Sequence, residues 1–431
     1  MSSTKNQNYV LPIIMMIALF GMISFVTGLQ NPMGIIVKNQ FGASNLMSQL
    51  GNAANFIAYA FMGIPSGILL QRIGYKKTAL IAVIVGFVGV GIQFLSGSVG
   101  SFPVYLAGAF VSGFSMCMLN AVVNPMLNTL GGGGKKGNQL IQIGGSFNSL
   151  NATIVPVLVG YLIGDAAQAT IKDANPALLL AMGIFLVVFI VLYFVNIPEP
   201  RLAQEQAEHA KHIKDKHSPL SFRHFVLGAI AIFVYVGIEV GIPNFANLYM
   251  TSTPAEGGLA ISTTTAGSIV GTYWFLMLIG RLFGGAFGAK ISSRAMLGGT
   301  ATLAGIFVLL AIFSPAETKI SMPVFMSDIS FGMANVPLKV AFLILCGLCT
   351  SVMWGGIFNL AVEGLGKYTE AASGIFMVLV CGGGIIPLVQ GVVADSVGFV
   401  ESFWVILACI AFLMYYAFVG YKNVNTDIPV K

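Results

Sequence analysis

The chain has 431 residues, of which 56% are hydrophobic and only 8% are charged. An average soluble domain carries about 25% charged residues. A soluble globular surface is therefore excluded, and most of the outside of the protein must face lipid. The net charge of +6 does not indicate a nucleic-acid partner, because such a partner needs basic residues clustered on one soluble face. Here the basic residues fall in short gaps between apolar stretches.

Taken in chain order, the apolar stretches predict twelve transmembrane helices, since one span needs about 20 apolar residues. The predicted spans cover 9–38, 44–71, 78–98, 102–130, 139–164, 177–197, 222–250, 261–289, 295–314, 338–365, 372–396 and 400–421. We expect an all-α polytopic membrane protein in which residues 1–197 and 222–431 form two pseudo-symmetric six-helix bundles. The polar stretch 198–221 is predicted to be the linker between them.

The distribution of basic residues predicts the orientation of the spans. Of the 21 Lys and Arg residues, all but Lys38, Lys172, Lys319 and Lys339 fall in gaps or tails on the same side as the N-terminus. Basic residues accumulate on the cytoplasmic side of a membrane, so both termini and the linker are expected to be cytoplasmic.

No metal site and no cofactor is predicted. Cys346 and Cys349 form a C-x-x-C pair without a second pair, and His209 and His212 lie in the linker without further ligands. Zinc sites need about four converging ligands. A bound Na⁺ is the one exception that we consider below.

The two halves of the chain resemble each other at corresponding positions. The fifth span ends in P-x-x-x-G followed by Asp165, and the eleventh ends in P-x-x-x-G followed by Asp395. Duplicated halves are typical of transporters whose halves rock around a site between them. The run Gly382–Gly384 in span eleven fits either a broken helix next to that site or a kink that serves helix packing.

The gap after the second span reads G-I-L-L-Q-R-I-G-Y-K-K over residues 67–77. It resembles the G-x-x-x-D-R-x-G-R-K signature of the major facilitator superfamily. Glycines permit a tight turn and close helix contact, and the arginine can pair with a carboxylate on a neighbouring helix. Gln71 stands where the signature has aspartate, which weakens that pairing. The second half carries G-R-x-x-G at the matching place. We assign gating or structural roles to Gly67, Arg72, Gly74, Lys76, Arg281 and Glu363.

Three further segments resemble one branch of this superfamily, the fucose/glucose/galactose or fucose–proton symporter family. They are Q-I-G-G-S-F-N-S at 142–149, Y-V-G-I-E-V at 235–240 and G-I-I-P at 384–387. The resemblance covers nearly the whole chain and implies a bacterial inner-membrane sugar importer driven by a cation. Proton symporters of the family carry carboxylates in spans one and four. Asn31 and Asn120 stand at those positions here, and neither side chain can exchange a proton near neutral pH.

Glu239 is the one carboxylate predicted near the middle of a span. Intramembrane carboxylates are costly and usually functional, so Glu239 is the candidate cation-coupling residue. Na⁺ is slightly favoured over H⁺, because neighbouring amide oxygens can complete a sodium shell but cannot relay protons. No mid-span Arg or Lys is expected to pair with Glu239. Glu363 is expected to pair with Arg281 or a nearby lysine in preference to binding substrate.

Amide side chains are numerous in the predicted spans. A sugar needs oriented donors and acceptors and an apolar face, and one amide provides both a donor and an acceptor. Candidate substrate-binding residues are Gln30, Asn31, Asn120, Asn124, Gln142, Asn148, Asn151, Asn244 and Asn359, with Tyr273, Trp274 and Trp354 for stacking. The amides suit helix packing equally well, and the aromatic residues suit a lipid interface. Spans four and five supply the strongest candidates, because their amides repeat on one helix face.

Other classes of function fit less well. No Walker A pattern is present, so ATP is not the expected driver. A channel would need a filter or oligomeric pore helices, and an enzyme would need an acid/base pair that one mid-span glutamate cannot supply. The sequence predicts a monomeric transporter of a neutral hexose or deoxyhexose in a lipid bilayer. The lack of a mid-span cation argues against anionic sugars. A uniporter of sugars and an exporter of another small polar or amphipathic solute are the alternatives.

Overall fold

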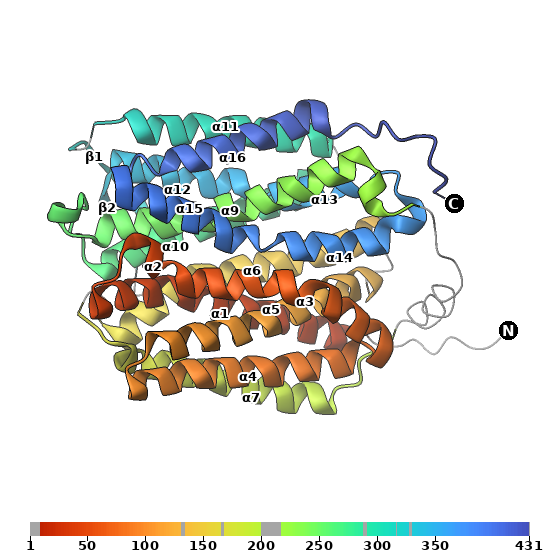
Figure 1. Cartoon of the computed structure of the whole chain (residues 1–431), viewed down its shortest axis with the longest axis horizontal. Coiled ribbons are helices and arrows are strands. Elements are labelled where there is room, and N and C mark those ends of the chain that lie inside the picture. Colours follow the sequence, from red (N-terminus) through yellow and green to blue (C-terminus); the bar gives the residue numbers. More distant parts are fainter. Residues whose placement is uncertain are drawn as a thin grey trace.

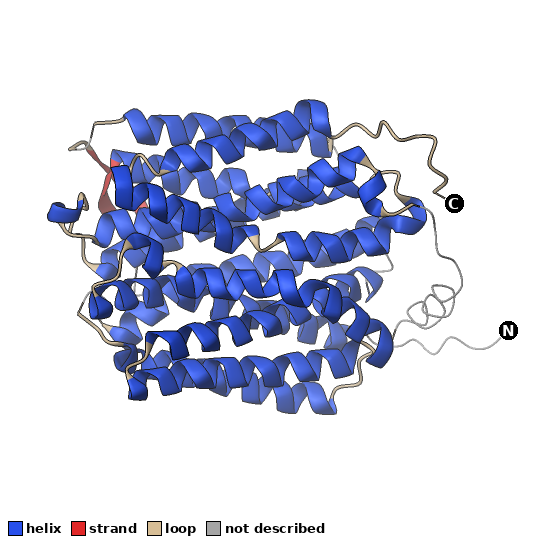
Figure 2. Ribbon diagram, viewed as in Figure 1, coloured by secondary structure: helices blue, strands red, loops and turns tan. Residues whose placement is uncertain are grey.

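The computed structural model describes residues 9–130, 134–164, 168–199, 217–287, 291–315, 317–326 and 330–430. Within these ranges the chain forms a bundle of long helices with a single two-stranded hairpin (Figures 1 and 2). Ten helices of this described part are long and apolar enough to cross a membrane, and one bent pair adds an eleventh. The predicted class, a polytopic helical membrane protein, is confirmed.

The elements follow the predicted spans in order. The first half contains α1 (Val10–Phe41), α2 (Asn45–Ser48), α3 (Leu50–Ile73), α4 (Tyr75–Val99), α5 (Phe102–Leu130), α6 (Gly134–Ile163), η1 (Ile171–Ala174) and α7 (Asn175–Phe194). The second half contains η2 (Pro219–Ser221), α9 (Arg223–Thr251), η3 (Pro254–Glu256), α10 (Thr263–Phe287), α11 (Ser293–Phe313), β1 (Lys319–Phe325), β2 (Phe331–Pro337), α12 (Leu338–Thr350), α13 (Met353–Val362), η4 (Gly366–Tyr368), α14 (Thr369–Leu379), α15 (Gly382–Val397), α16 (Phe403–Tyr415) and η5 (Tyr416–Gly420).

One helix or one pair of successive helices stands at each of the twelve predicted spans. The 30-residue α6 corresponds to span five, and its Lys, Asn and Gln residues make it less apolar than its neighbours. Most of the predicted linker, residues 200–216, lies outside the described residues. The boundaries of the two halves therefore stay a prediction.

The two ends of the bundle differ. The C-terminal segment, η4 and the Val10 end of α1 lie at one end, whereas α2, η3 and the hairpin lie at the other (Figure 1). We name these the terminal end and the hairpin end.

The hairpin β1–β2 is a feature that the span pattern does not predict. Its strands pair antiparallel from Lys319 opposite Pro337 to Phe325 opposite Phe331. The hairpin packs on α10, where the ring centroid of Phe275 lies 4.9 Å from that of Phe331. Pro323 inside β1 hides the strand from sequence reasoning, because proline is rarely found inside strands.

Two spans of the second half are broken. In span eleven α14 ends at Leu379 and α15 begins at Gly382, so the interruption lies at residues 380–381, directly before the glycine run, which is itself helical. A second break separates α12 from α13, with a bend of 40°. The sequence gives no sign of this second break, because T-S-V at 350–352 contains neither glycine nor proline.

The glycine run allows the two halves to touch. A Cβ atom at Gly384 would lie 2.9 Å from the Cα atom of Ala53 in α3. The side-chain nitrogen of Asn52 donates to the carbonyl of Gly383 over 3.0 Å. Direct backbone approach of this kind drives helix association in membranes, where water exclusion contributes little. The run therefore packs α15 of the second half against α3 of the first.

Gly384→Ala tests this contact. The added methyl meets backbone atoms of α3 that cannot move aside cheaply, so we expect a loss of about 1–3 kcal/mol in stability. Thermal unfolding of the purified protein in detergent measures it. Gly374→Ala is the matched control, because a Cβ there meets no atom within 4 Å. Equal melting temperatures for the two variants would show that the close approach does not matter.

Candidate functional site

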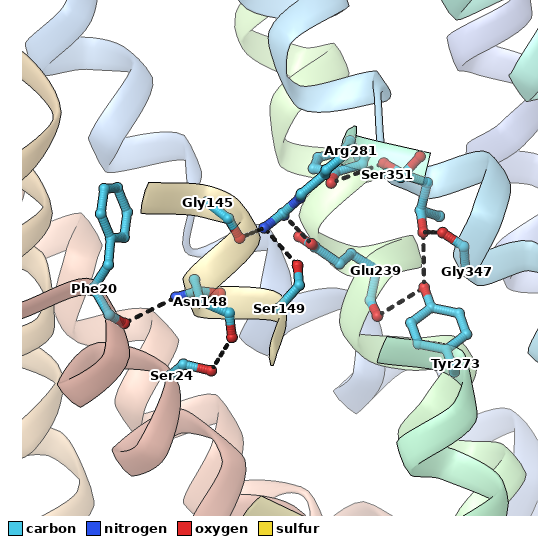
Figure 3. A network of polar contacts seen from close by, with 12 residues as sticks. Phe20, Ser24, Gly145, Asn148, Ser149, Glu239, Tyr273, Arg281, Gly347 and Ser351 are labelled. Carbon is cyan, nitrogen blue, oxygen red and sulfur yellow. Dashed lines mark hydrogen bonds and ion pairs between the residues drawn. The ribbon is translucent and has the colours of Figure 1, made fainter. Parts of the chain in front are cut away.

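Arg281 of α10 lies between the two halves and contacts three oxygen atoms (Figure 3). Its Nη1 donates to the carbonyl of Gly145 over 2.7 Å and to Ser149 Oγ over 2.8 Å, both on α6. Its Nη2 lies 3.4 Å from Oε1 of Glu239 on α9. The guanidinium is planar and offers five donors, so one side chain joins a carboxylate of its own half to α6 of the other half.

Glycines of α10 permit close packing beside Arg281. A Cβ on Gly145 of α6 would make only an ordinary contact with Arg281 Nη1, at 3.6 Å. On the other side of α10, Gly280 packs against Ser351 and Gly284 against Val352. These glycines are those of the G-R-x-x-G motif. They bring α10 close to the α12–α13 break and leave Arg281 facing α6.

The ion pair overturns two expectations from the sequence. Glu239 is not without a basic partner, and Arg281 pairs with Glu239 and not with Glu363. The Glu363 side chain is exposed, and its carbonyl lies 2.9 Å from His224 Nε2. The reason is side-chain direction. Helical side chains point toward the N-terminus of their helix, so Arg281, near the terminal end of α10, reaches back to the depth of Glu239.

The predicted aromatic residues gather behind Glu239. The Tyr273 hydroxyl donates to the Glu239 carbonyl over 3.2 Å and lies 3.1 Å from Thr350 Oγ1. Tyr235 lies beside the Glu239 carboxylate and donates to the Thr350 carbonyl. Tyr273 is fully buried and supports the site from behind. Sequence reasoning assigns no role to Tyr235 or Thr350, although Tyr235 lies in a family segment.

The two tryptophans pack on these tyrosines. The ring of Trp274 lies 5.2 Å from that of Tyr273, and the ring of Trp354 lies 6.2 Å from that of Tyr235. Both tryptophans are partly buried. Each tryptophan therefore contacts a tyrosine that itself contacts Glu239.

The amides of α5 and α6 bond to neighbouring helices or to their own. Asn148 donates to the carbonyl of Phe20 on α1 over 3.3 Å, and its own carbonyl accepts from Ser24 (Figure 3). Asn120 donates to the Tyr59 hydroxyl over 2.9 Å. Asn124 and Asn151 each bond to a carbonyl one turn earlier in their helix, and both are partly buried. The side chains of Asn31 and Gln142 lie outside the described part of the chain.

The remaining amide candidates lie in separate places. Gln30 Oε1 accepts from the Tyr105 hydroxyl over 2.9 Å, within the first half. Asn244 donates to Gln49 Oε1 over 3.0 Å and thereby joins α9 to the segment after α2. Asn359 is exposed on α13. The predicted amides thus do not form one cluster, and those nearest to Arg281 are on α6.

Polar contacts also join the halves at the hairpin end. Lys38 Nζ lies 3.3 Å from Glu256 Oε1 and donates to Ser252 Oγ over 2.8 Å. Asp395 accepts from the backbone N–H groups of Asn45 and Leu46 at the start of α2, over 2.9 and 3.0 Å. A carboxylate is favourable at a helix N-terminus. These contacts hold the two halves together at the hairpin end.

The Glu256 carboxyl has a perturbed pKa. Partial burial raises this pKa, but hydrogen bonds from the Thr253 backbone and the Lys38 ammonium group outweigh that effect. The pKa of Glu256 is therefore held below its ordinary value.

The first-half signature forms the predicted tight turn between α3 and α4. Gly74 has a φ of 84°, a left-handed value that favours glycine. The Glu199 carboxylate accepts from the backbone N–H groups of Tyr75 and Lys76, and Lys76 Nζ donates to the Tyr193 carbonyl. Arg72 is exposed, and a Cβ on Gly67 would meet no atom within 4 Å. Glu199 is a partner that the motif alone does not reveal.

Comparison with known proteins identifies the family. The family model described as "Major Facilitator Superfamily" matches residues 14–334. The chain belongs to the major facilitator superfamily. It is 31% identical to the "Glucose/galactose transporter" of Brucella abortus biovar 1 (strain 9-941) over 428 residues, which cover 98% of this chain and 96% of that protein. It is 22% identical to the "L-fucose-proton symporter" of Escherichia coli (strain K12), covering 96% and 94%.

A solved structure agrees with the fold. The crystal structure of the major facilitator transporter FucP in the outward conformation matches with a TM-score of 0.66 and 18% identity, covering 95% of this chain and 98% of that chain. The predicted resemblance to the superfamily and to its fucose/glucose/galactose branch is confirmed. These relatives are transporters, so the prediction that the chain is not an enzyme is also confirmed. Across the described residues, no group of three or more His, Cys, Asp or Glu converges on a metal position.

Glu256→Gln tests the hairpin-end ion pair. Because Glu256 is 47% exposed, removing the pair should favour opening of this end by only about 0.5 kcal/mol, roughly twofold. Alkylation of a Ser48→Cys variant by an impermeant maleimide measures the opening, since Ser48 is buried. Asp173→Asn is the control, because Asp173 bonds only to Thr170 in its own loop.

The same assay has a pH dependence of known sign. A lowered pKa means that the contribution of Glu256 is complete above its ordinary pKa of 4.5 and is lost as the pH falls through the lowered value. In the Ser48→Cys background, the alkylation rate divided by that of an exposed cysteine at the same pH should therefore rise below about pH 4.5, because the division removes the loss of thiolate in acid. An acid step of the same size in Glu256→Gln would assign the effect to another group.

Proposed function

We propose that this protein is a secondary transporter that imports a neutral sugar, of the hexose or deoxyhexose class, by alternating access. Two relatives support this proposal. One is named a glucose/galactose transporter and the other an L-fucose-proton symporter, and each aligns with nearly the full chain. The many amide side chains of the spans, among them Asn244, which joins the halves, suit a polyhydroxylated solute.

The charge balance at Arg281 and Glu239 is the observation that carries the choice of a neutral substrate. The sequence argument against anions, the lack of a mid-span cation, fails because Arg281 reaches the interface. Arg281 is instead neutralised by Glu239, and both side chains are only 14–15% exposed. An anionic sugar would have to break this pair to gain a partner, and breaking a largely buried pair is costly.

The proposal includes coupling to a cation at Glu239. With asparagines at the family's two carboxylate positions, Glu239 is the mid-span carboxylate of the described chain and can bind H⁺ or Na⁺ by charge. Hard cations bind oxygen ligands. Three such oxygen atoms are present here: Glu239 Oε1, Ser149 Oγ and the Gly145 carbonyl. We favour Na⁺ slightly over H⁺ on this ground.

We further propose that the terminal end faces the cytoplasm of a bacterium, that the chain spans the inner membrane and that it acts as a monomer. The positions of Lys and Arg support this orientation. In this orientation the hairpin end, where Lys38 and Asp395 join the halves, faces the periplasm. Import requires the hairpin-end contacts of Lys38 and Asp395 to break once per cycle.

Glu239→Gln tests the coupling. The variant keeps the shape of the side chain but removes its charge, so gradient-driven accumulation of labelled sugar in proteoliposomes should be abolished. Exchange of sugar across the membrane should persist in part. Glu363→Gln is the control, because Glu363 is an exposed carboxylate of the same half.

Two results would contradict this assignment. Accumulation against a gradient by Glu239→Gln would place coupling elsewhere. Wild-type uptake that ignores every imposed Na⁺ and H⁺ gradient would indicate a uniporter.

Asn120→Ala and Asn148→Ala test the sugar site. Each variant leaves a partner group unpaired near the interface, and sugar binding should weaken by about 1–3 kcal/mol. Counterflow with a panel of labelled sugars measures the loss. Asn335→Ala on the exposed hairpin is the control. Wild-type affinity in both interface variants would move the site away from α5 and α6.

A further inference from the structure

The guanidinium of Arg281 is held as a bound cation would be. It contacts a carboxylate oxygen, a hydroxyl oxygen and a carbonyl oxygen, which come from α9 and α6. Figure 3 shows these three atoms converging on it from two helices of opposite halves. Among the described residues, Arg281 is thus the positively charged group that pairs with Glu239.

Only one positive charge fits beside Glu239 at a time. The titratable groups that face the Glu239 carboxylate are Arg281 on α10 and the hydroxyl of Tyr235 on its own helix, with Tyr273 of α10 at its backbone. One carboxylate can neutralise one cation, and a second unpaired charge at this depth is costly. A cation that binds Glu239 therefore competes with Arg281.

Arg281 has a route away from the site. It lies less than two turns before Phe287, the last residue of α10. Long basic side chains can bury their stems and carry the charged group to water near a helix end. Displacement thus returns the guanidinium to solvent and does not leave it unpaired in the interface.

We propose that Arg281 is an internal counter-cation of Glu239, displaced by the coupling cation, and that its bonds to α6 transmit this displacement to the first half. The proposal rests on the proposed cation coupling at Glu239. When Arg281 leaves Glu239, the bonds to Gly145 and Ser149 are broken in the same movement, since one guanidinium makes all three contacts. Binding of a cation to Glu239 in the second half then removes the hydrogen bonds of Arg281 to α6 of the first half. Arg281 is a positioning residue and does not itself bind the sugar.

Cation affinity without sugar is the first test. Trp274 and Trp354 pack on the tyrosines around Glu239, so tryptophan fluorescence of the full-length protein in nanodiscs reports the site. NaCl is titrated at constant pH and ionic strength, and pH is titrated without Na⁺. Arg281→Gln should lower the half-saturating cation concentration roughly tenfold, because a neighbouring opposite charge shifts proton affinity by at least about tenfold. Glu239→Gln should abolish the response.

The outcomes separate this inference from the proposed function. Unchanged or weaker cation affinity in Arg281→Gln overturns the counter-cation role, even if sugar transport by the wild type is found. Absence of any response to Na⁺ or H⁺ in the wild type overturns both this role and the coupling. Sugar counterflow tests the transport proposal independently.

Transmission to the first half is the second test. Spin labels at the exposed positions Lys77 and Ala371, on α4 and α14, report the distance between the halves at the terminal end. Ser149→Ala removes one contact between the halves and keeps Glu239 and Arg281. Its distance distribution without cation should shift in the same direction as that of the wild type on cation addition.

The matched control lies one turn away on the same helix. Thr153 is buried and bonds only to the Ser149 carbonyl of its own helix, so Thr153→Ala should leave the distribution unchanged. Arg281→Lys keeps the charge but loses the planar fork, so it should retain near-normal cation affinity and show the shift of Ser149→Ala. Distributions equal to wild type in Ser149→Ala and Arg281→Lys would overturn transmission through α6.

Discussion

An ion pair at the centre of a membrane protein constrains every element around it. Each charge of the Arg281–Glu239 pair would cost several kcal/mol in a low-dielectric environment if it were alone. Helices α9 and α10 must therefore keep these two side chains together, or else supply each with another partner. The glycines at 280 and 284 set the distance of α10 from the α12–α13 break. Tyr235 bonds to the Glu239 carboxylate, and Tyr273 donates to the Glu239 backbone carbonyl. The packing of α9, α10 and the α12–α13 break thus keeps Arg281 and Glu239 paired.

Two kinds of contact join the halves, and they differ in reversibility. Gly384 against Ala53 is a packing contact without polar atoms that change partners. Lys38, Glu256 and Asp395 make polar contacts whose groups water can satisfy after separation. A carrier needs both kinds, because packing guides the halves along a shared surface and exchangeable polar contacts permit the end to open. The partial exposure of Glu256 keeps its ion pair weak enough to break.

The sequence predicts the fold well because lipid imposes a simple rule on spanning helices. Each predicted span has a helix or helix pair, and the close approach of α15 to α3 occurs at the glycine run that the sequence marks. Prediction fails where tertiary contacts decide. The α12–α13 break after Thr350 lacks glycine and proline, and Pro323 conceals the hairpin. Spacing along α10 cannot show that Arg281 reaches back to Glu239, because the outcome depends on side-chain direction and on which oxygen atoms of α9 and α6 lie within reach. The amides illustrate the same limit, since Asn148 uses its side chain to hold α1.

The bend between α12 and α13 is a point about which α13 can rotate. Thr350, which both tyrosines beside Glu239 contact, is the last residue of α12, so the pivot lies next to the ion pair. The ten residues of α13 extend about 15 Å from it. A rotation of about 10° at the pivot moves the far end of α13 by about 3 Å, which is about the diameter of a water molecule. A small angular change beside Glu239 is therefore enough to admit or exclude one layer of water at the terminal end.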